Sequence, residues 1–163
     1  MSDTPFRPFE QSLDPGKALD LLTQATQGAE DGELFLERRR SEALVFDDGR
    51  IKTASYDASE GFGLRAVRDD VTGYAHSTEL TMASLRRAAD TARLAVGDGG
   101  GTQADGPAYT NRRLYSDDDP ILGQPFPVKI ETLKEIDAYA RDLDPRVVQV
   151  TASIAASMQE VSI

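Results

Sequence analysis

The sequence contains no cysteine and no tryptophan, and His76 is its single histidine. Without cysteine, the chain forms no disulfide, offers no thiolate to a metal ion and has no cysteine nucleophile. One histidine also excludes a zinc site built from several histidines within these 163 residues. The sequence likewise identifies no Ser-His-Asp triad, because the histidine has no assignable partners.

Long apolar runs are also missing. The N-terminal stretch Met1 to Leu13 lacks the apolar segment of a signal peptide. Nowhere does the chain approach 18 consecutive apolar residues, so we expect no membrane-spanning helix and no membrane partner. Because a cysteine-free chain loses nothing in a reducing compartment, we expect a cytoplasmic location.

Basic residues are outnumbered, with 18 Lys and Arg against 28 Asp and Glu, for a net charge of −10. Such a field repels phosphate backbones, so we expect no nucleic-acid partner. The length suits one globular domain with a real core. We expect residues 1–13 to form an N-terminal extension and residues 14–163 to form the domain.

Three segments carry the start and stop signals of helices. The first opens at Asp14-Pro15 and ends before Gly28, the second runs from Thr81 to Gly97, and the third runs from Pro127 to Asp144. Each has an apolar stripe at helical spacing. The stripes are Ala18, Leu21, Leu22 and Ala25; then Leu85, Ala88, Ala89, Ala92, Ala95 and Val96; then Ile130, Leu133, Ile136, Ala140 and Leu143.

Between Glu33 and Thr78 the apolar period is two, which predicts a meander of about four strands. Asp48-Gly49 predicts a type I′ hairpin turn, and Asp69-Asp70 predicts a second turn. Alternation from Val148 to the last residue predicts a further strand. We therefore expect an α+β fold, a two-layer sandwich whose mostly antiparallel sheet carries helices on one face. Because the strand rhythm continues to Ile163, we expect the chain to be truncated relative to a larger protein.

The segment 98–127 is the least regular, and its role cannot be derived from the sequence. Gly97 to Gly101 follows a helix, whereas a phosphate-binding loop precedes one, so we interpret it as a flexible connector. Asp117, Asp118 and Asp119 lack the ligand spacing of a calcium loop, so we interpret them as a solvated loop.

Three residues are candidates for substrate or partner contact: Arg65, Tyr74 and His76. His76 lies beside Tyr74 on a predicted strand and is either a polar group at a substrate groove or an ordinary sheet-face histidine. Arg65 follows Gly63 on one strand face, where a glycine leaves room for another backbone. Arg65 is therefore either a ligand or partner contact or one half of a structural ion pair.

The run Arg38-Arg39-Arg40 alternates between the two faces of its strand and forms no single patch. We expect its members to form ion pairs with Glu33, Glu37 and Glu42. A strip that docks a partner protein is the alternative interpretation.

Three stretches in order resemble the N-terminal domain of the TldD/PmbA family, whose older name is modulator of DNA gyrase. They are 45–53 (VFDDGRIKT), 61–67 (GFGLRAV) and 73–80 (GYAHSTEL), followed by the alanine-rich helix with Leu85, Ala88 and Ala92. The Phe46-Asp47-Asp48-Gly49 turn and Asp119-Pro120 are more similar to the TldD branch. The likeness covers roughly residues 14–163.

This resemblance implies a zinc metallopeptidase in the full-length protein. Members carry a His-Glu-x-x-x-His helix and a cysteine ligand, and neither occurs here. No catalytic or metal residue can therefore be carried over, and we expect no cofactor and no activity in this segment alone. Catalysis and zinc are expected in a downstream domain, while this segment shapes the peptide-substrate channel and the partner interface.

The resemblance also implies partners and an alternative function. The substrate would be a peptide or unfolded polypeptide, and the assembly a homodimer or a heterodimer with TldE/PmbA. The alternative is a non-enzymatic regulator that binds another protein, as the name gyrase modulator suggests. A free-standing domain that binds a small molecule is a third hypothesis, and no specific residue pattern supports it.

Overall fold

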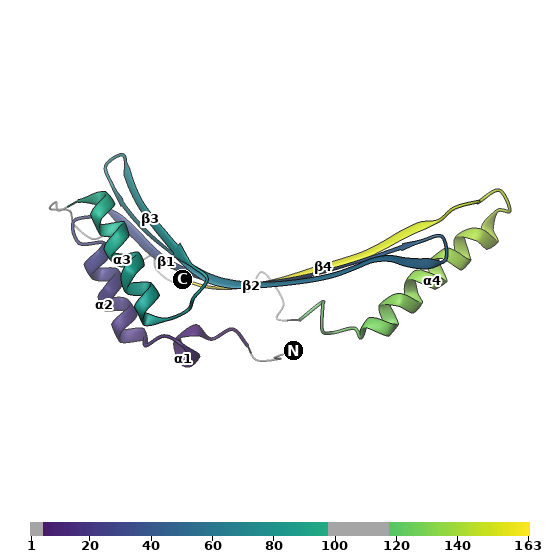
Figure 1. The fold of residues 1–163 in the computed structure, drawn as a ribbon, viewed down its shortest axis with the longest axis horizontal. Helices are drawn as coiled ribbons and strands as arrows, with labels where there is room; N and C mark the ends of the chain where they lie inside the picture. Colours follow the sequence, from purple (N-terminus) through teal and green to yellow (C-terminus); the bar gives the residue numbers. More distant parts are fainter. Residues whose placement is uncertain (1–4, 98–117) are drawn as a thin grey trace. The chain divides into compact units, whose positions relative to one another are not determined.

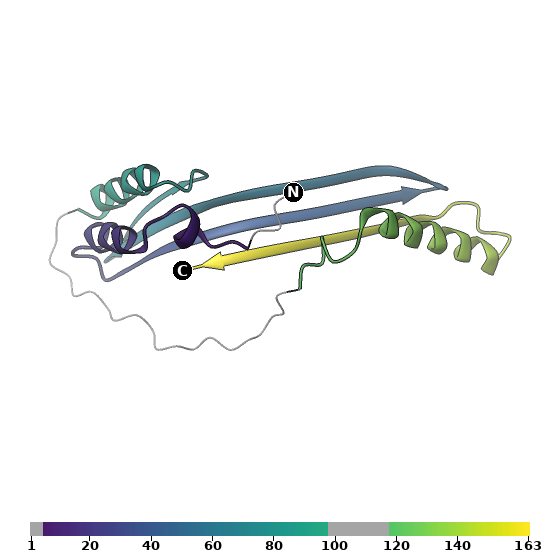
Figure 2. The same ribbon diagram turned by 90° about the horizontal axis from the view of Figure 1, so that it is seen from below.

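The computed structural model describes residues 5–97 and 118–163 (Figure 1). In chain order its elements are helices α1 (Pro8–Gln11) and α2 (Pro15–Ala25), strands β1 (Asp31–Asp47), β2 (Arg50–Arg68) and β3 (Val71–Ser77), helices α3 (Met82–Val96) and α4 (Phe126–Leu143), and strand β4 (Thr151–Ser162). The strands form one sheet in the order β3-β2-β1-β4, and neighbouring strands run antiparallel (Figure 2). The predicted α+β class, an antiparallel sheet with helices packed against it, is confirmed.

The hairpin between β1 and β2 is tight because its two turn residues adopt left-handed backbone angles. The φ angles of Asp48 and Gly49 are 48° and 81°, as a type I′ turn requires. The stretch 31–77 forms three strands rather than about four, since β1 and β2 run unbroken over 17 and 19 residues. Charged residues also occur in mid-strand, where Arg38 of β1 pairs with Glu60 of β2 at 3.1 Å.

The helix boundaries follow the predicted signals. The Asp14 carboxylate accepts a hydrogen bond from the Lys17 N–H at 2.9 Å and caps α2. The Thr81 hydroxyl accepts one from the Ser84 N–H at 3.2 Å and caps α3, which ends at Gly97 with a φ of 70°. One stripe position on α3 was wrong: Ala95 is exposed, and Ser84 is buried instead.

The described residues divide into two compact units. Unit 1 comprises residues 5–38, 59–97 and 160–163, and unit 2 comprises residues 39–58 and 118–159. The predicted division into residues 1–13 and 14–163 stays a prediction. Residues before 14 nevertheless contribute to unit 1, where Leu13 is buried and both Phe6 and Phe9 pack against the core.

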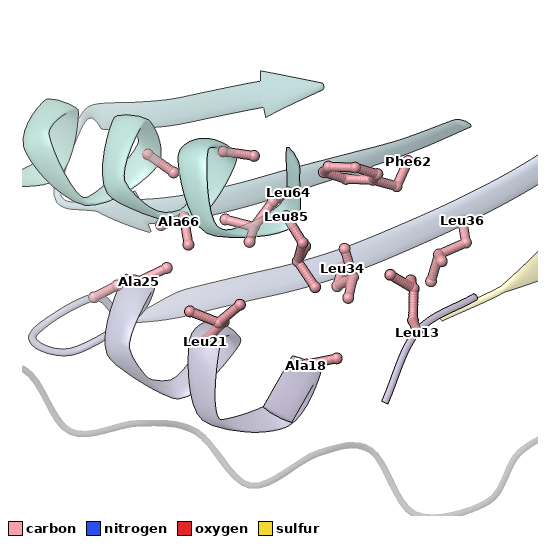
Figure 3. Packing of buried hydrophobic residues seen from close by; sticks show 14 of the residues in the cluster. Leu13, Ala18, Leu21, Ala25, Leu34, Leu36, Phe62, Leu64, Ala66 and Leu85 are labelled. Atoms are coloured by element: carbon pink, nitrogen blue, oxygen red, sulfur yellow. The ribbon is translucent and has the colours of Figure 1, made fainter. Parts of the chain in front are cut away.

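In unit 1, α2 and α3 cover one face of β1 and β2 (Figure 1). Leu34 and Leu64 from the strands meet Leu21 and Leu85 from the two helices in one apolar cluster (Figure 3). Strand β3 lies against α3 so closely that a Cβ on Gly73 would come within 2.3 Å of the Ala92 carbonyl oxygen. Only glycine fits there without a shift of the backbone.

In unit 2, the single helix α4 packs on the sheet through Leu133, which contacts a small cluster with Leu44 and Phe46. The predicted stripe of α4 was wrong at Ile136 and Leu143, which are exposed. No second helix among the described residues of unit 2 flanks α4, so only one narrow line of the helix is buried.

Strand β4 begins at Thr151, so the predicted alternation starts too early at Val148, which is exposed. Among the described helices, none is long and apolar enough to cross a membrane.

Candidate functional site

Arg65, Tyr74 and His76 lie together on the face of the sheet in unit 1 that is opposite to α2 and α3. In the antiparallel register of β2 and β3, Arg65 stands opposite Tyr74, and Gly63 stands opposite His76. The neighbouring residues Leu64 and Ala66 are buried under the helices, so these side chains point the other way. The rings of Tyr74 and His76 stack at 5.7 Å between centroids. We call Arg65, Tyr74 and His76 the β2–β3 patch.

Arg65 is anchored by two acids from β1. Its Nε donates to Glu33 Oε1 at 3.1 Å, and a terminal nitrogen donates to Asp31 Oδ2 at 2.7 Å. The hydrogen bond to Glu33 and both negative charges raise the pKa of the guanidinium, against a smaller opposing effect of burial. Arg65 is therefore one half of a structural ion pair, and its charge is largely neutralised within the chain.

The space over Gly63 is filled by a side chain of the same unit, the ring of Tyr74. A Cβ there would lie 2.8 Å from the Tyr74 hydroxyl oxygen, so the tyrosine ring covers this glycine. The prediction that Gly63 leaves room for another backbone was wrong for that reason. What the patch offers to a partner is the Tyr74 ring, 59% exposed, with the exposed His76 beside it.

Free strand edges occur in unit 2. Strand β3 pairs with β2 only from Phe62 to Arg68, and the sheet order leaves no described strand beside residues 50–58 of β2. Strand β4 is the other end of the order, so its outer edge is also unpaired among the described strands. Each edge presents main-chain N–H and C=O groups to which an extended chain can hydrogen bond.

A hollow of about 380 Å³ opens on unit 2 between these edges. It is lined by small and polar side chains from the three strands, namely Ser41, Glu42, Ala43, Ser55, Asp57, Ala155, Ala156 and Ser157. The residues lining it include no histidine and offer two carboxylates, Glu42 and Asp57, of which Glu42 is already bound to Lys129 at 2.5 Å.

In the described part of the acidic segment Asp117-Asp118-Asp119, the contacts of Asp119 are with groups of the protein itself. Asp119 accepts hydrogen bonds from the N–H groups of Ile121 and Leu122 and pairs with Arg40 at 2.9 Å. Burial alone would raise the pKa of Asp119, but these contacts outweigh it and lower the pKa. Asp117 and residues 98–101 lie outside the described residues. Within residues 5–97 and 118–163, no three His, Asp or Glu side chains gather as a metal site would require.

Two members of the arginine run form ion pairs with acids from other parts of the fold. Arg38 pairs with Glu60 at 3.1 Å and lies over the Phe6 ring at 5.0 Å. Arg40 pairs with Asp119, as described above. Of the expected partners, Glu33 pairs with Arg65 and Glu42 pairs with Lys129. The pairing of the run with Glu37 stays a prediction.

Sequence reasoning missed Lys129, whose side chain is only 5% exposed. Its Nζ donates to Glu42 Oε1 at 2.5 Å and to the Ile121 carbonyl oxygen at 2.6 Å. The signal was present, because Lys129 precedes Leu133 by one helical turn and so shares its buried line. This ion pair joins α4 to β1 and to the turn after Asp119.

Asp47 links the three strands of unit 2 at the hairpin end. Its carboxylate accepts hydrogen bonds from Thr151 at 2.7 Å, Lys52 at 3.0 Å and Gln149 at 3.1 Å. These bonds, with Thr151 the largest contributor, hold the pKa of Asp47 far below its ordinary value. The carboxylate is therefore a structural acceptor and not a proton donor at neutral pH.

Residues 32–96 match the family model described as PmbA/TldA metallopeptidase domain 1. Over 137 residues, 83% of this chain, the sequence is 28% identical to the metalloprotease TldD homolog of Buchnera aphidicola subsp. Acyrthosiphon pisum. The resemblance to the TldD/PmbA family is thereby confirmed. The chain spans 28% of the length of that relative.

Two solved structures share the fold. One, described as a modulator of a DNA gyrase from Thermotoga maritima, has a TM-score of 0.62 at 14% identity and covers 90% of this chain and 38% of its own. The other is TldE from Thermococcus kodakarensis, with a TM-score of 0.55 at 17% identity, covering 89% of this chain and 34% of its own. At these identities the likeness concerns the fold alone.

Proposed function

Because residues 32–96 match the model of PmbA/TldA metallopeptidase domain 1, we propose that the chain belongs to this family and is the polypeptide-holding domain of a TldD-type zinc metallopeptidase. The match of residues 32–96 to that domain is the observation that carries the proposal. In the proposal, this domain shapes the substrate channel and the partner interface. Peptide-bond cleavage takes place in another domain of the full-length protein.

The donor set of this chain does not fit a zinc centre. It has no cysteine, and its single histidine stacks on Tyr74 at an exposed position. Zinc in such enzymes polarises a carbonyl and activates water. We therefore assign the expected zinc and all catalytic residues to the part of the protein outside this chain.

The free edges of unit 2 support a role in holding polypeptide. An extended chain that adds to a sheet edge bonds through its main chain, which gives affinity with little dependence on sequence. Residues 50–58 of β2 are all exposed, so no other described part of the chain covers them. The small residues around the hollow allow a backbone to approach the sheet face.

The β2–β3 patch is the proposed contact for substrate or partner in unit 1. Its two stacked, exposed rings are available for contact, while the guanidinium of Arg65 remains bound to Asp31 and Glu33. The proposed assembly is a homodimer or a heterodimer with a TldE/PmbA partner, and the proposed location is cytoplasmic.

Peptide binding by the purified chain tests this function. The probe is an unstructured fluorescent decapeptide, compared with the same peptide N-methylated at every residue. We expect saturable binding without cleavage, and at least about tenfold weaker binding of the methylated peptide, because several main-chain hydrogen bonds are lost. We expect Tyr74→Ala to weaken binding, whereas Leu94→Ala, at an exposed position of α3, has no effect.

Cleavage of the decapeptide by the chain alone would overturn the proposal. So would equal affinity for the two peptides, since binding would then not use main-chain groups. If the chain bound neither peptide but bound a folded protein, the alternative would be favoured, namely a non-enzymatic regulator of the gyrase-modulator kind.

A further inference from the structure

Helix α4 carries a second apolar line that faces away from the core. Val128, Ile136, Tyr139 and Leu143 are 47%, 44%, 68% and 67% exposed, and Thr132 is exposed among them. These five residues, which we call the α4 seam, all belong to unit 2. The line of the helix that packs on the sheet is a different one, formed by Leu133, Lys129 and the partly buried Ile130.

The spacing of the α4 seam is that of a helix-to-helix contact. Successive members are separated by four, four, three and four residues. Alternation of three and four is the a/d pattern by which two helices pack side by side, and the seam keeps it from Thr132 to Leu143, with Val128 one helical turn before. A solvated helix face needs no such regularity, so the seam has the pattern of a docking face for another helix.

Acidic residues border the seam on one side. Glu131, Glu135 and Asp142 each stand three residues after a seam member, so all three project along the same flank. Lys134 offsets Glu131, whereas no ion pair of α4 with another described residue involves Glu135 or Asp142, so these two carry the charge of the flank. Lys129 pairs with Glu42, Lys134 with Glu131 at 3.2 Å, and Arg141 with Asp137 at 3.1 Å.

We propose that the α4 seam docks an amphipathic helix of a partner protein whose apolar line is bordered by lysine or arginine. Basic border residues would meet the acidic flank, as charges beside an a/d seam select a partner. A second copy of this chain fits poorly. In an antiparallel pair of α4 helices related by a twofold axis, the two acidic flanks would face each other.

Two designed peptides test the proposal on the full chain. Both have three heptads with leucine at positions a and d; one carries lysine at e and g, and the other carries glutamate there. Like charges at e and g disfavour self-association of either peptide. By fluorescence anisotropy we expect the lysine peptide to bind at least about tenfold more tightly than the glutamate peptide.

The variant Ile136→Glu/Tyr139→Glu separates seam binding from general attraction to an acidic chain. It adds negative charge, so general attraction would strengthen, whereas we expect loss of binding with an unchanged circular dichroism spectrum. Leu94→Glu on α3, 83% exposed, is the matched control and should not weaken binding. Glu135→Lys/Asp142→Lys should reverse the preference in favour of the glutamate peptide.

Three results would overturn the proposal. The first is that neither peptide binds, and the second is that Ile136→Glu/Tyr139→Glu leaves binding of the lysine peptide intact. The third is a dimer of the chain in sedimentation that Ile136→Glu/Tyr139→Glu dissociates, because the seam would then be occupied by a second copy.

Discussion

The two units hold their helices in different ways. Unit 1 buries fifteen residues in one cluster under α2 and α3, whereas the buried cluster of unit 2 consists of Leu44, Phe46 and Leu133. Unit 2 adds to these three residues an ion pair that is nearly excluded from water, Lys129 with Glu42. Alternating strands therefore yield a large apolar core where two helices cover them and a mixed polar anchor where one does.

The comparison predicts how each unit responds when a contact is removed. A large apolar cluster loses only part of its packing when one side chain is shortened. A buried ion pair that loses one partner leaves an uncompensated charge, which is costly in a dry environment.

Lys129→Ala should lower the free energy of unfolding by about 3–5 kcal/mol, because Glu42 is left without its partner. Hydrogen exchange should show the loss of protection concentrated in α4 and residues 39–47. Lys134→Ala removes an exposed pair on the same helix and should cost at most about 1 kcal/mol. Equal effects of the two variants in urea denaturation would contradict the anchoring role of Lys129.

Leu133→Ala and Leu85→Ala remove fully buried leucines from unit 2 and unit 1. Each should lower the free energy of unfolding by ~2–5 kcal/mol. Amide exchange distinguishes them, since Leu133→Ala should release unit 2 while unit 1 stays protected. If Leu133→Ala lowered protection evenly over both units, the difference between their cores would have no energetic meaning.

Gly73→Ala should destabilise unit 1 by about 1–3 kcal/mol, because its Cβ would press on the carbonyl group of Ala92. The matched change Gly16→Ala in α2 meets only the Asp14 carboxylate at 3.4 Å and should stabilise the chain by about 0.5–1 kcal/mol. Thermal melting of the two variants would show opposite shifts. A Gly73→Ala variant that melts no lower than the native chain would mean that β3 can move away from α3.

Asp47→Asn tests how the Asp47 carboxylate, which links the three strands of unit 2, contributes to stability at different pH values. The native fold holds the pKa of Asp47 below its unfolded value, so the carboxylate stabilises the fold fully above about pH 4. This stabilisation fades as the pH falls below that value toward the folded pKa. The asparagine variant should melt at a lower temperature at pH 7 and lose less stability on acidification. If the melting temperatures of the two proteins changed with pH in parallel, this prediction would be contradicted.

Local signals in the sequence predicted much of the fold. Asp48-Gly49 specified its hairpin because few residues tolerate two successive positive φ angles, and Asp14 and Thr81 specified caps because their side chains reach backbone donors within one turn. Period two predicted strands but not their ends, since an alternating pattern does not show where a ladder stops.

Contacts between residues far apart in the chain could not be predicted from the sequence. Lys129 is buried because Glu42 lies opposite it, 87 residues earlier in the chain. Arg65 is an ion-pair partner because Asp31 and Glu33 stand on the neighbouring strand. The predicted buried stripe of α4 was wrong at two positions for a similar reason. Helical spacing identifies apolar lines on a helix but not which of these lines another element covers.

The same distinction applies to the candidate site. Arg65, Tyr74 and His76 were chosen singly from their strands, and their meeting on one face depends on the register of β2 with β3. The turn at Asp69-Asp70 makes such a pairing foreseeable, but the coverage of Gly63 by the Tyr74 ring follows only from the packed structure.

Calorimetric titration of the purified full chain with zinc tests whether this chain holds a metal centre of its own. We expect no stoichiometric binding, because the chain has no cysteine and a single histidine. A tight one-to-one complex, accompanied by hydrolysis of a peptide, would contradict this expectation.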